Sequence, residues 1–295
     1  MRRLDFLIKK VRFNSNNLDE NRFSDLEIST FFNDAQRHIQ NIIVQNNPRN
    51  DLFSSEYILE TSDGTEEYLL PPDIFAVSAI NSVDIRSGGS KNKFYPVRAL
   101  SNSDRGTGLG YIIRGNKIIF TPIPERTVIN GARIIYVRKL YDIGPRFGKI
   151  TSVTGNTVVF DSLVDEGLEI VNYSDFISVV DVDGEFKSKK IRIDNYDATG
   201  ISHTVTTSDD LSDVQIGDYS MSGENTTTHS ELPDVCELTL TNFVERTIHT
   251  VDSSADMSSS NNLTNEERSA IIELFKSTPQ DPAYPPIFSD EYIIR

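Results

Sequence analysis

Several residue types that build common sites are scarce or missing from this 295-residue sequence. Tryptophan is absent, and Cys236 is the only cysteine. A single cysteine excludes an intramolecular disulfide and a zinc site made of several cysteines. The four histidines never adopt the H-x-x-x-H or H-E-x-x-H spacing of a helical metal site; they are His38, His203, His229 and His249.

Long apolar stretches are also missing. No run approaches the roughly 18 apolar residues of a membrane-spanning helix. The opening "MRRLDFLIKKVRF" has charges on both sides of a short apolar stretch, so we do not expect a signal peptide. These features predict a protein that has no membrane partner and is made in the reducing interior of a cell.

Acidic residues outnumber basic residues in the sequence, and the net charge is −15. Such a chain is a poor candidate for gripping nucleic acid, because phosphate must be neutralised by Lys and Arg. The charge is uneven, since residues 1–12 hold five basic side chains against Asp5, whereas residues 205–256 hold eleven acids against Arg246. This polarity favours a protein that docks different faces on different partners. A solvated acidic face is the alternative.

The motifs of common catalytic sites do not occur. Gly106, Gly108 and Gly110 in "RGTGLGYIIRGNKIIF" match neither a Walker loop nor a dinucleotide-binding loop, and a hairpin pattern follows them instead of a helix. Cys236 lies on an apolar helix face, which predicts a buried side chain. The acidic stretch 181–186 lacks the spacing of a calcium loop. We therefore predict no catalytic, cofactor-binding or metal-binding residue, and a protein that is not an enzyme.

Two long segments have helical periodicity. Ser24 and Glu27 form a capping-box pair ahead of a helix that ends before Pro48. A second helix is predicted over residues 233–252. The side chains expected to form the packed faces of both helices are Phe31, Ala35, Ile39, Ile42, Leu240, Phe243 and Ile248. A Thr264–Glu267 capping box predicts a further short helix.

Short strands separated by turn residues fill much of the remaining sequence. Turns at Asp63–Gly64, Gly115–Asn116, Gly155–Asn156 and Asp183–Gly184 each predict a hairpin between the flanking strands. We expect an α+β fold in which long amphipathic helices pack with a β-strand and hairpin region. An inserted small all-β module and an extended Pro-rich C-terminal arm complete the predicted fold.

The predicted organisation has four parts. These are an N-terminal helix and β region over 1–147, the inserted module over 148–222, closing helices over 223–278 and the arm over 279–295. Apolar side chains on an extended terminus favour contact with a partner. We expect docking to a partner or neighbouring subunit through Arg2, Arg3, Lys9, Lys10, Tyr284, Phe288, Tyr292, Ile293 and Ile294.

The order of several segments resembles the head-to-tail adaptor proteins of tailed bacteriophages. "SDLEISTFFNDAQRHIQNII" is similar to their opening helix, and "EEYLLPPDIFAVSAINSVDI" is similar to their Leu-Pro-x-Asp corner and the strand after it. "YPVRALSNSDR", "GYIIRGNKIIFTPIPE" and "ARIIYVRKLYD" resemble the next strands in order. "LPDVCELTLTNFVERTIHTVDSSAD" looks like the closing helix. The resemblance covers roughly residues 18–145 and 231–277.

The resemblance implies a structural virion protein in the neck between capsid and tail. It implies a ring of twelve subunits that docks beneath the portal, extends the DNA channel and presents a platform to the next neck or tail protein. DNA would pass through without specific binding. The 148–222 module has no counterpart in compact adaptors, so a glycan-binding or glycan-cleaving virion component stays open as the alternative.

Overall fold

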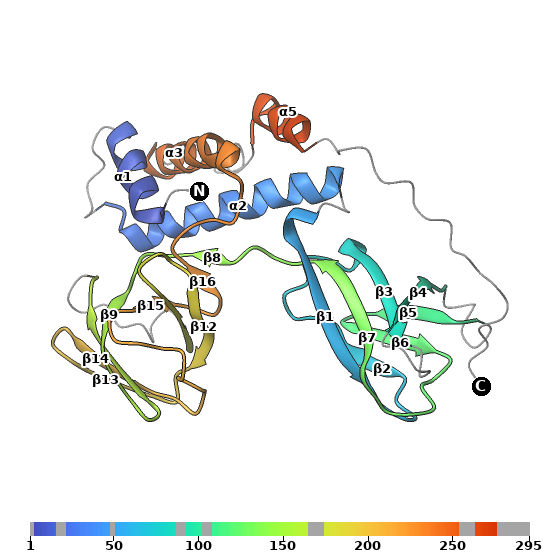
Figure 1. The fold of residues 1–295 in the computed structure, drawn as a ribbon. Helices are drawn as coiled ribbons and strands as arrows, with labels where there is room; N and C mark the ends of the chain where they lie inside the picture. Colours follow the sequence, from blue (N-terminus) through green and yellow to red (C-terminus); the bar gives the residue numbers. More distant parts are fainter. Residues whose placement is uncertain are drawn as a thin grey trace. The chain divides into compact units, whose positions relative to one another are not determined.

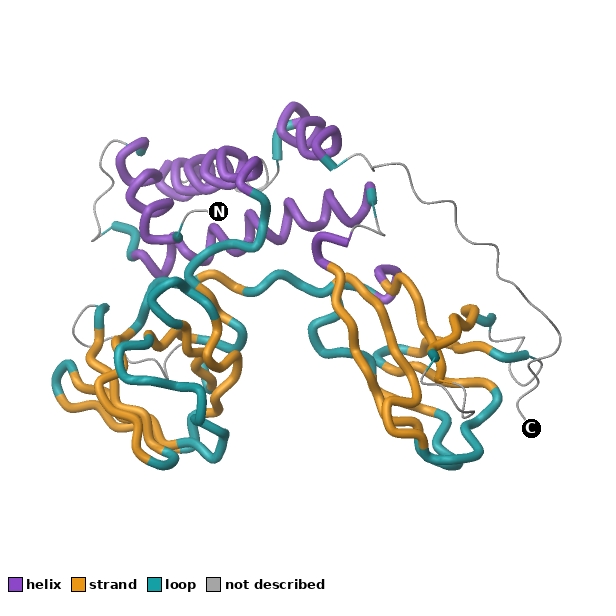
Figure 2. Tube along the Cα trace, in the orientation of Figure 1, coloured by secondary structure: helices purple, strands orange, loops and turns teal. Residues whose placement is uncertain are grey.

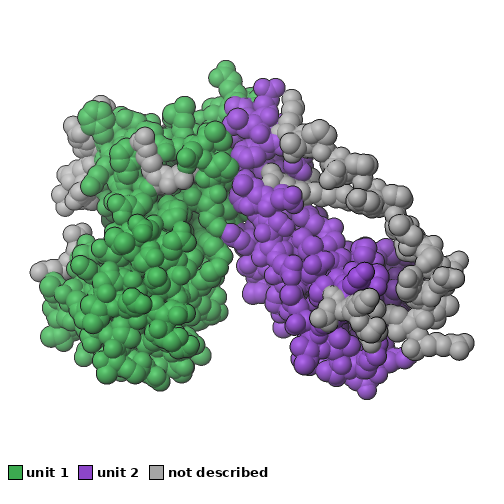
Figure 3. Space-filling view, viewed as in Figure 1, with its two compact units in different colours: residues 1–40, 140–269 green, residues 41–139, 270–295 purple. Residues whose placement is uncertain are grey.

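The computed structural model of this chain describes residues 3–15, 22–47, 51–86, 93–101, 108–164, 174–253 and 263–275. The chain divides into two compact units (Figure 3). Unit 1 comprises Met1–Gln40 and Leu140–Ser269, and unit 2 comprises Asn41–Lys139 and Ala270–Arg295. Each unit contains one seven-stranded sheet.

Four α-helices occur within the described residues (Figure 1): α1 (Leu4–Asn14), α2 (Asp25–Asn46), α3 (Glu237–Ser253) and α5 (Asn265–Leu274). Three short 3-10 helices are η1 (Asp51–Phe53), η2 (Val77–Ala79) and η5 (Asp234–Cys236). The predicted capping boxes are confirmed. Ser24 N donates to the Glu27 carboxylate at 2.8 Å while Glu27 N donates to Ser24 Oγ at 3.2 Å, and Thr264 and Glu267 repeat the arrangement before α5.

The sheet of unit 2 has the strand order β1-β7-β3-β4-β5-β6-β2. Its strands are β1 (Ser54–Thr61), β2 (Glu67–Leu69), β3 (Ile80–Arg86), β4 (Phe94–Ala99), β5 (Gly110–Arg114), β6 (Lys117–Thr121) and β7 (Val128–Val137). Apolar side chains that alternate along these strands form one core, which includes Leu59, Val83, Ile118, Phe120, Ala132 and Ile134. All neighbouring strands are antiparallel except β4 and β5.

The sheet of unit 1 has the order β12-β11-β15-β9-β10-β14-β13. Its strands are β9 (Gly148–Thr154), β10 (Thr157–Ser162), β11 (Phe176–Val180), β12 (Phe186–Arg192), β13 (Asn195–Thr199), β14 (Ser202–Thr206) and β15 (Tyr219–Ser222). They all lie between Gly148 and Ser222, the stretch in which the sequence predicts an inserted module. Their shared core includes Phe147, Ile150, Phe160, Ile177, Val179 and Val205.

The predicted fold class is wrong, because the protein is mainly β. The described residues contain sixteen strands and four α-helices, which Figure 2 draws in orange and purple. The two sheet cores are made of strand and loop side chains and contain no helical residue. Each sheet thus buries its own apolar face, so long helices packed on hairpins are not the basis of the fold.

The turn residues predict most hairpins correctly. β5–β6, β9–β10 and β11–β12 are antiparallel pairs around the expected turns, and Gly115 and Gly155 adopt φ of +61° and +56°. The hairpin predicted around Asp63–Gly64 is wrong. There β1 pairs with β7, and β2 pairs with β6 at the other edge of the sheet.

A polar face of α2 holds the segment Leu140–Ile143, which follows the last strand of the first sheet. Asn33 Nδ2 donates to the Ile143 carbonyl at 2.9 Å, and Ile143 N donates to Asn33 Oδ1 at 2.8 Å. Gln36 Nε2 donates to the Tyr141 carbonyl at 2.8 Å. On the other side, β8 (Asp142–Ile143) pairs in parallel with β16 (Thr226–Thr227). We call this arrangement the α2 clasp.

Candidate interaction surfaces

Helix α1 carries the basic residues that the sequence predicts for docking. One face of the helix is buried and consists of Leu4, Leu7, Ile8, Val11 and Arg12. Lys9 is exposed, whereas Lys10 is partly buried and its Nζ lies 3.3 Å from the Glu237 carboxylate of α3. Lys10 therefore fastens α1 to α3, while Lys9 is available to a partner.

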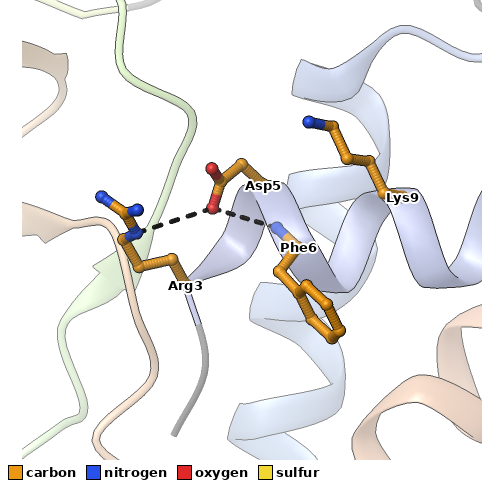
Figure 4. A pocket seen from close by; sticks show the side chains of 4 residues that line it. All are labelled: Arg3, Asp5, Phe6 and Lys9. Atoms are coloured by element: carbon orange, nitrogen blue, oxygen red, sulfur yellow. Dashed lines mark hydrogen bonds and ion pairs between the residues drawn. The ribbon is translucent and has the colours of Figure 1, made fainter.

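The start of α1 forms a surface hollow of about 380 Å³, lined by Arg3, Asp5, Phe6 and Lys9 (Figure 4). Asp5 Oδ1 accepts a hydrogen bond of 3.0 Å from Phe6 N and lies 4.0 Å from Arg3 Nε. Phe6 is 45% exposed, and Phe13, two turns later, is 75% exposed. The exposed side of α1 thus combines aromatic surface with positive charge.

A second arginine lies near Arg3. Arg146 donates to the Val182 carbonyl oxygen at 2.6 Å, and Arg3 donates to the same oxygen at 3.4 Å. The Arg146 guanidinium also stacks 3.9 Å from the Tyr219 ring centroid, a cation–π contact. The shared carbonyl neutralises neither guanidinium, although the Asp5 carboxylate lies 4.0 Å from Arg3, so Arg3, Lys9 and Arg146 bring three cations to this side of unit 1. We define Arg3, Phe6, Lys9, Phe13 and Arg146 as the basic patch.

Unit 1 also carries an acidic surface, in the loop that precedes Tyr219, the ring on which Arg146 stacks. No Lys or Arg occurs between Ile193 and Glu245. Within this stretch the loop 207–218 displays Asp209, Asp210 and Asp213, all exposed. Ile216 in the same loop is 71% exposed. We call residues 207–218 the acidic loop.

The remaining predicted docking residues fall outside the described part of the chain. They are Arg2, Tyr284, Phe288, Tyr292, Ile293 and Ile294, together with the whole arm 279–295. Gly106 in the glycine-rich stretch also falls outside it, whereas Gly110 begins β5 with its Cα hydrogens against Leu100 and the Arg98 carbonyl. A Cβ at Gly110 would lie 2.4 Å from that carbonyl oxygen, so close packing accounts for this glycine.

The side chains predicted to pack the helices lie as follows. Ala35, Ile39 and Ile42 of α2 are buried, and Phe31 is half-buried with its ring edge-on to Phe23. In α3, the buried side chains are Leu240, Phe243 and Ile248. The Phe243 ring also contacts His38 of α2, with ring centroids 5.4 Å apart.

Cys236 and His203, residue types that can act as a nucleophile or a metal ligand, are buried and pack within the fold. Burial raises the pKa of the Cys236 thiol to about 11, so the thiolate needed for nucleophilic chemistry is disfavoured at neutral pH. His203 is buried against the Phe160 ring and hydrogen-bonds the Tyr196 hydroxyl. No group of three His, Cys, Asp or Glu side chains suited to a metal ion exists among the residues that the structure describes.

The Leu-Pro-x-Asp corner of the sequence has a clear structural role in unit 2. Asp73 Oδ1 accepts a 2.7 Å hydrogen bond from the Tyr136 hydroxyl, and the Asp73 carbonyl accepts a bond from Lys139 N. Burial and the Asp73 carboxylate raise the pKa of Tyr136 to about 12. Leu70 is buried in the sheet core. These hydrogen bonds therefore connect the chain segment that precedes β3 to the end of β7.

Residues 3–146 match the family model of the SU10 adaptor protein, a phage head-tail adaptor family. Residues 3–146 are an SU10 adaptor region. The match confirms the resemblance seen in the sequence, and it supports a structural adaptor role and a place in the virion. The matched segment contains α1, α2, the whole first sheet and the Asp73 corner.

The adaptor region ends just before β9, so the second sheet lies outside the family match. A search of curated proteins finds no match to the chain. Within the described residues, no helix has the length and apolar character needed to cross a membrane.

Of the basic residues that the sequence proposes for docking, Arg3 and Lys9 are exposed and Lys10 is partly buried, whereas the sequence does not single out Arg146 or Ile216. Arg146 gives no sequence signal, because its role depends on a carbonyl 36 residues away in the chain. Ile216 resembles an ordinary strand residue in "QIGDYSM", and only the structure shows that it faces outward while its neighbour Val214 is buried.

Proposed function

We propose that this chain is a head-to-tail adaptor subunit whose copies form a ring that joins the portal to the tail and extends the DNA channel. The observation that carries the proposal is the SU10 adaptor match over residues 3–146. A ring of twelve subunits in the neck of the virion is the assembly that we propose. Its partners are the portal on one side and the next neck or tail protein on the other.

The charge of the chain suits this role. A net charge of −15 gives a surface that repels DNA phosphate, so DNA slides past it without being held. A channel lined by acidic side chains follows from this reasoning. A ring structure with a strongly basic lumen contradicts it.

The proposed domain arrangement has an adaptor core of residues 1–147 and 223–278 with the module 148–222 inserted into it. We propose that the module lies on the outside of the ring or contacts another neck protein. Docking to the portal or to neighbours is assigned to the basic start of the chain and to the arm 279–295. We infer no enzymatic activity, in keeping with the structural family.

Electron microscopy of the purified protein, alone and mixed with the portal of the same virion, tests the proposal. The expected result is a closed ring coaxial with the portal. A monodisperse monomer that never joins the portal contradicts it. Deletion of residues 279–295 is expected to abolish portal binding while circular dichroism of the monomer stays unchanged.

A matched pair of charge changes tests the basic start of the chain. Lys9→Glu is expected to weaken assembly of the ring on the portal, because Lys9 is exposed on α1 and is assigned to docking with the portal or a neighbouring subunit. Lys149→Glu is the control, since Lys149 is an equally exposed lysine on β9 of the second sheet. Equal effects of the two changes would show that only net charge matters.

A further inference from the structure

We infer that the basic patch on one copy of this chain binds the acidic loop of a second copy, in a head-to-tail contact within unit 1. The inference rests on the proposed ring and names the surfaces that build it. It concerns residues 207–218 and the exposed side of α1. The family match identifies neither of them as an interface.

The basic patch is a preformed receptor. The opposite side of α1 is locked by buried Leu4, Leu7 and Ile8, so the helix presents its outer side rigidly. That outer side carries Phe6 and Phe13 at a spacing of two turns, with Lys9 between them. Aromatic residues flanked by cations are typical of the centre of protein interfaces.

The acidic loop is held in one shape by its own anchors. Leu211 and Val214 are buried in the sheet core, at 7% and 6% exposure. Asp218 accepts a 2.8 Å hydrogen bond from Gln215 N, and Gly217 N donates to the Ile150 carbonyl at 2.9 Å. These contacts fix the backbone on both sides of Ile216, which is 71% exposed, so the acidic loop displays an apolar side chain with little backbone entropy left to lose.

Charge complementarity selects a second copy as the occupant. Two chains of net charge −15 repel each other over most of their surfaces, and such repulsion opposes self-association. Contact is attractive where the cations of the basic patch of one copy meet exposed carboxylates of the acidic loop of another. Asp209 already accepts a 2.6 Å hydrogen bond from Arg192 N of its own chain, so Asp210 and Asp213 supply the charge for this contact.

The pairing joins two different surfaces of the same chain. Such a heterologous contact repeats from copy to copy, and it closes into a ring when the rotation between copies allows. Ile216 would enter the hollow beside Phe6, and Asp210 and Asp213 would face Lys9 and Arg3. Both surfaces belong to unit 1, so the contact does not require a particular placement of unit 2.

Cysteine cross-linking tests the contact directly in the full-length chain. Cys236 is 1% exposed, which leaves the natural protein unreactive as a background. Phe6→Cys and Ile216→Cys proteins are mixed at about 1 mM, which populates even a contact with a Kd in the millimolar range, and then oxidised mildly. We expect a mixed disulfide dimer on a non-reducing gel.

Ile201→Cys is the matched control, because Ile201 is 54% exposed at the tip of the β13–β14 hairpin of the same sheet. It should give at most background cross-linking with Phe6→Cys. Equal yields for Ile216→Cys and Ile201→Cys would overturn the contact. A strong Phe6→Cys homodimer would also overturn it, since that product requires a symmetric interface.

A charge exchange gives an independent readout. Lys9→Glu and Asp213→Lys are each expected to weaken self-association about tenfold, and a mixture of the two proteins should recover it. Failure of the mixture to recover binding rejects the pairing. Rings on the portal without the cross-link would leave the proposed function standing and reject the contact. A cross-link without portal binding would support the contact and contradict the proposed function.

Discussion

The two seven-stranded sheets of this protein are stabilised differently. The first sheet, inside the SU10 adaptor region, combines its apolar core with ionised and hydrogen-bonded side chains between strands. Arg133 Nη2 lies 2.5 Å from the Asp84 carboxylate, and Tyr136 donates to Asp73. The core of the second sheet is apolar and aromatic, with His203 stacked on Phe160.

This difference has a physical meaning. A paired charge fixes which strand lies beside which, because an unpaired partner in the interior is costly. Aromatic packing supplies more stability but tolerates volume-conserving exchange. Both sheets contain aromatic rings and polar contacts between strands, and they differ in kind: the first has the Arg133–Asp84 ion pair, and the second has the hydrogen bond between His203 and Tyr196.

The largest expected effect is in the second sheet. Phe160→Ala removes a fully buried ring and should lower the free energy of unfolding of that sheet by about 3–5 kcal/mol. Hydrogen exchange measured by mass spectrometry would show loss of protection in residues 148–222. Phe176→Ala, at a half-buried ring in β11, is the control and should cost clearly less. Equal losses of protection in the two variants would mean that burial of the Phe160 ring in the core does not decide the stability of the second sheet.

The next effect concerns the ion pair in the first sheet. Asp84→Ala leaves Arg133 without its close carboxylate and should cost about 2–4 kcal/mol, since the Asp84 side chain is 7% exposed. Chemical denaturation would measure the change. Glu56→Gln is the matched control, because Glu56 is 47% exposed and 3.7 Å from Arg133; a change below about 0.5 kcal/mol is expected there.

A smaller effect is expected at the Asp73 corner. Tyr136→Phe removes the hydroxyl and should cost about 1 kcal/mol. The pKa of Tyr136 is raised from 10.0 to about 12 in the folded protein. The stabilisation is therefore fully present below pH 10 and is lost as the pH rises towards 12. Unfolding measured between pH 8 and 12 should show this decline in the natural chain and a weaker one in Tyr136→Phe.

The smallest effect compares one turn from each sheet. Gly115 and Gly155 both adopt positive φ, with open space where a Cβ would lie. Alanine at either position should cost about 1 kcal/mol through backbone strain alone. Thermal melts of the two variants should show similar shifts. A much larger shift for one of them would show that its sheet depends on that hairpin more than the other does.

The sequence predicts features that depend on neighbouring residues and fails where pairing is distant. The turns at Gly115–Asn116 and Gly155–Asn156 join strands that are adjacent in the chain, so local chemistry decides them. At Asp63–Gly64 the same chemistry gives a turn, yet β1 pairs with β7 more than 60 residues away. The predicted fold class is wrong for the same reason, since the closure of each sheet depends on distant pairing.

The candidate surfaces also depend on contacts between residues that are distant in the sequence. Lys9 can be placed on an exposed helix face from periodicity, whereas Lys10, one residue later, is engaged with Glu237 on a helix 227 residues away. Arg146 and Ile216 gain their positions only when the second sheet closes. Residue chemistry predicts which side chains suit a docking surface, and the tertiary fold decides which of them remain available.

The α2 clasp treats neighbouring positions of the segment that it holds differently. Asn33 and Gln36 bind carbonyl and amide groups of the Tyr141 and Ile143 backbone, so these hydrogen bonds do not depend on which side chains stand there. Asp142 differs, because its carboxylate lies 2.6 Å from Arg37 of the same helix. A change at Asp142 therefore alters a contact with α2, whereas the backbone hydrogen bonds tolerate changes of side chain on either side of it.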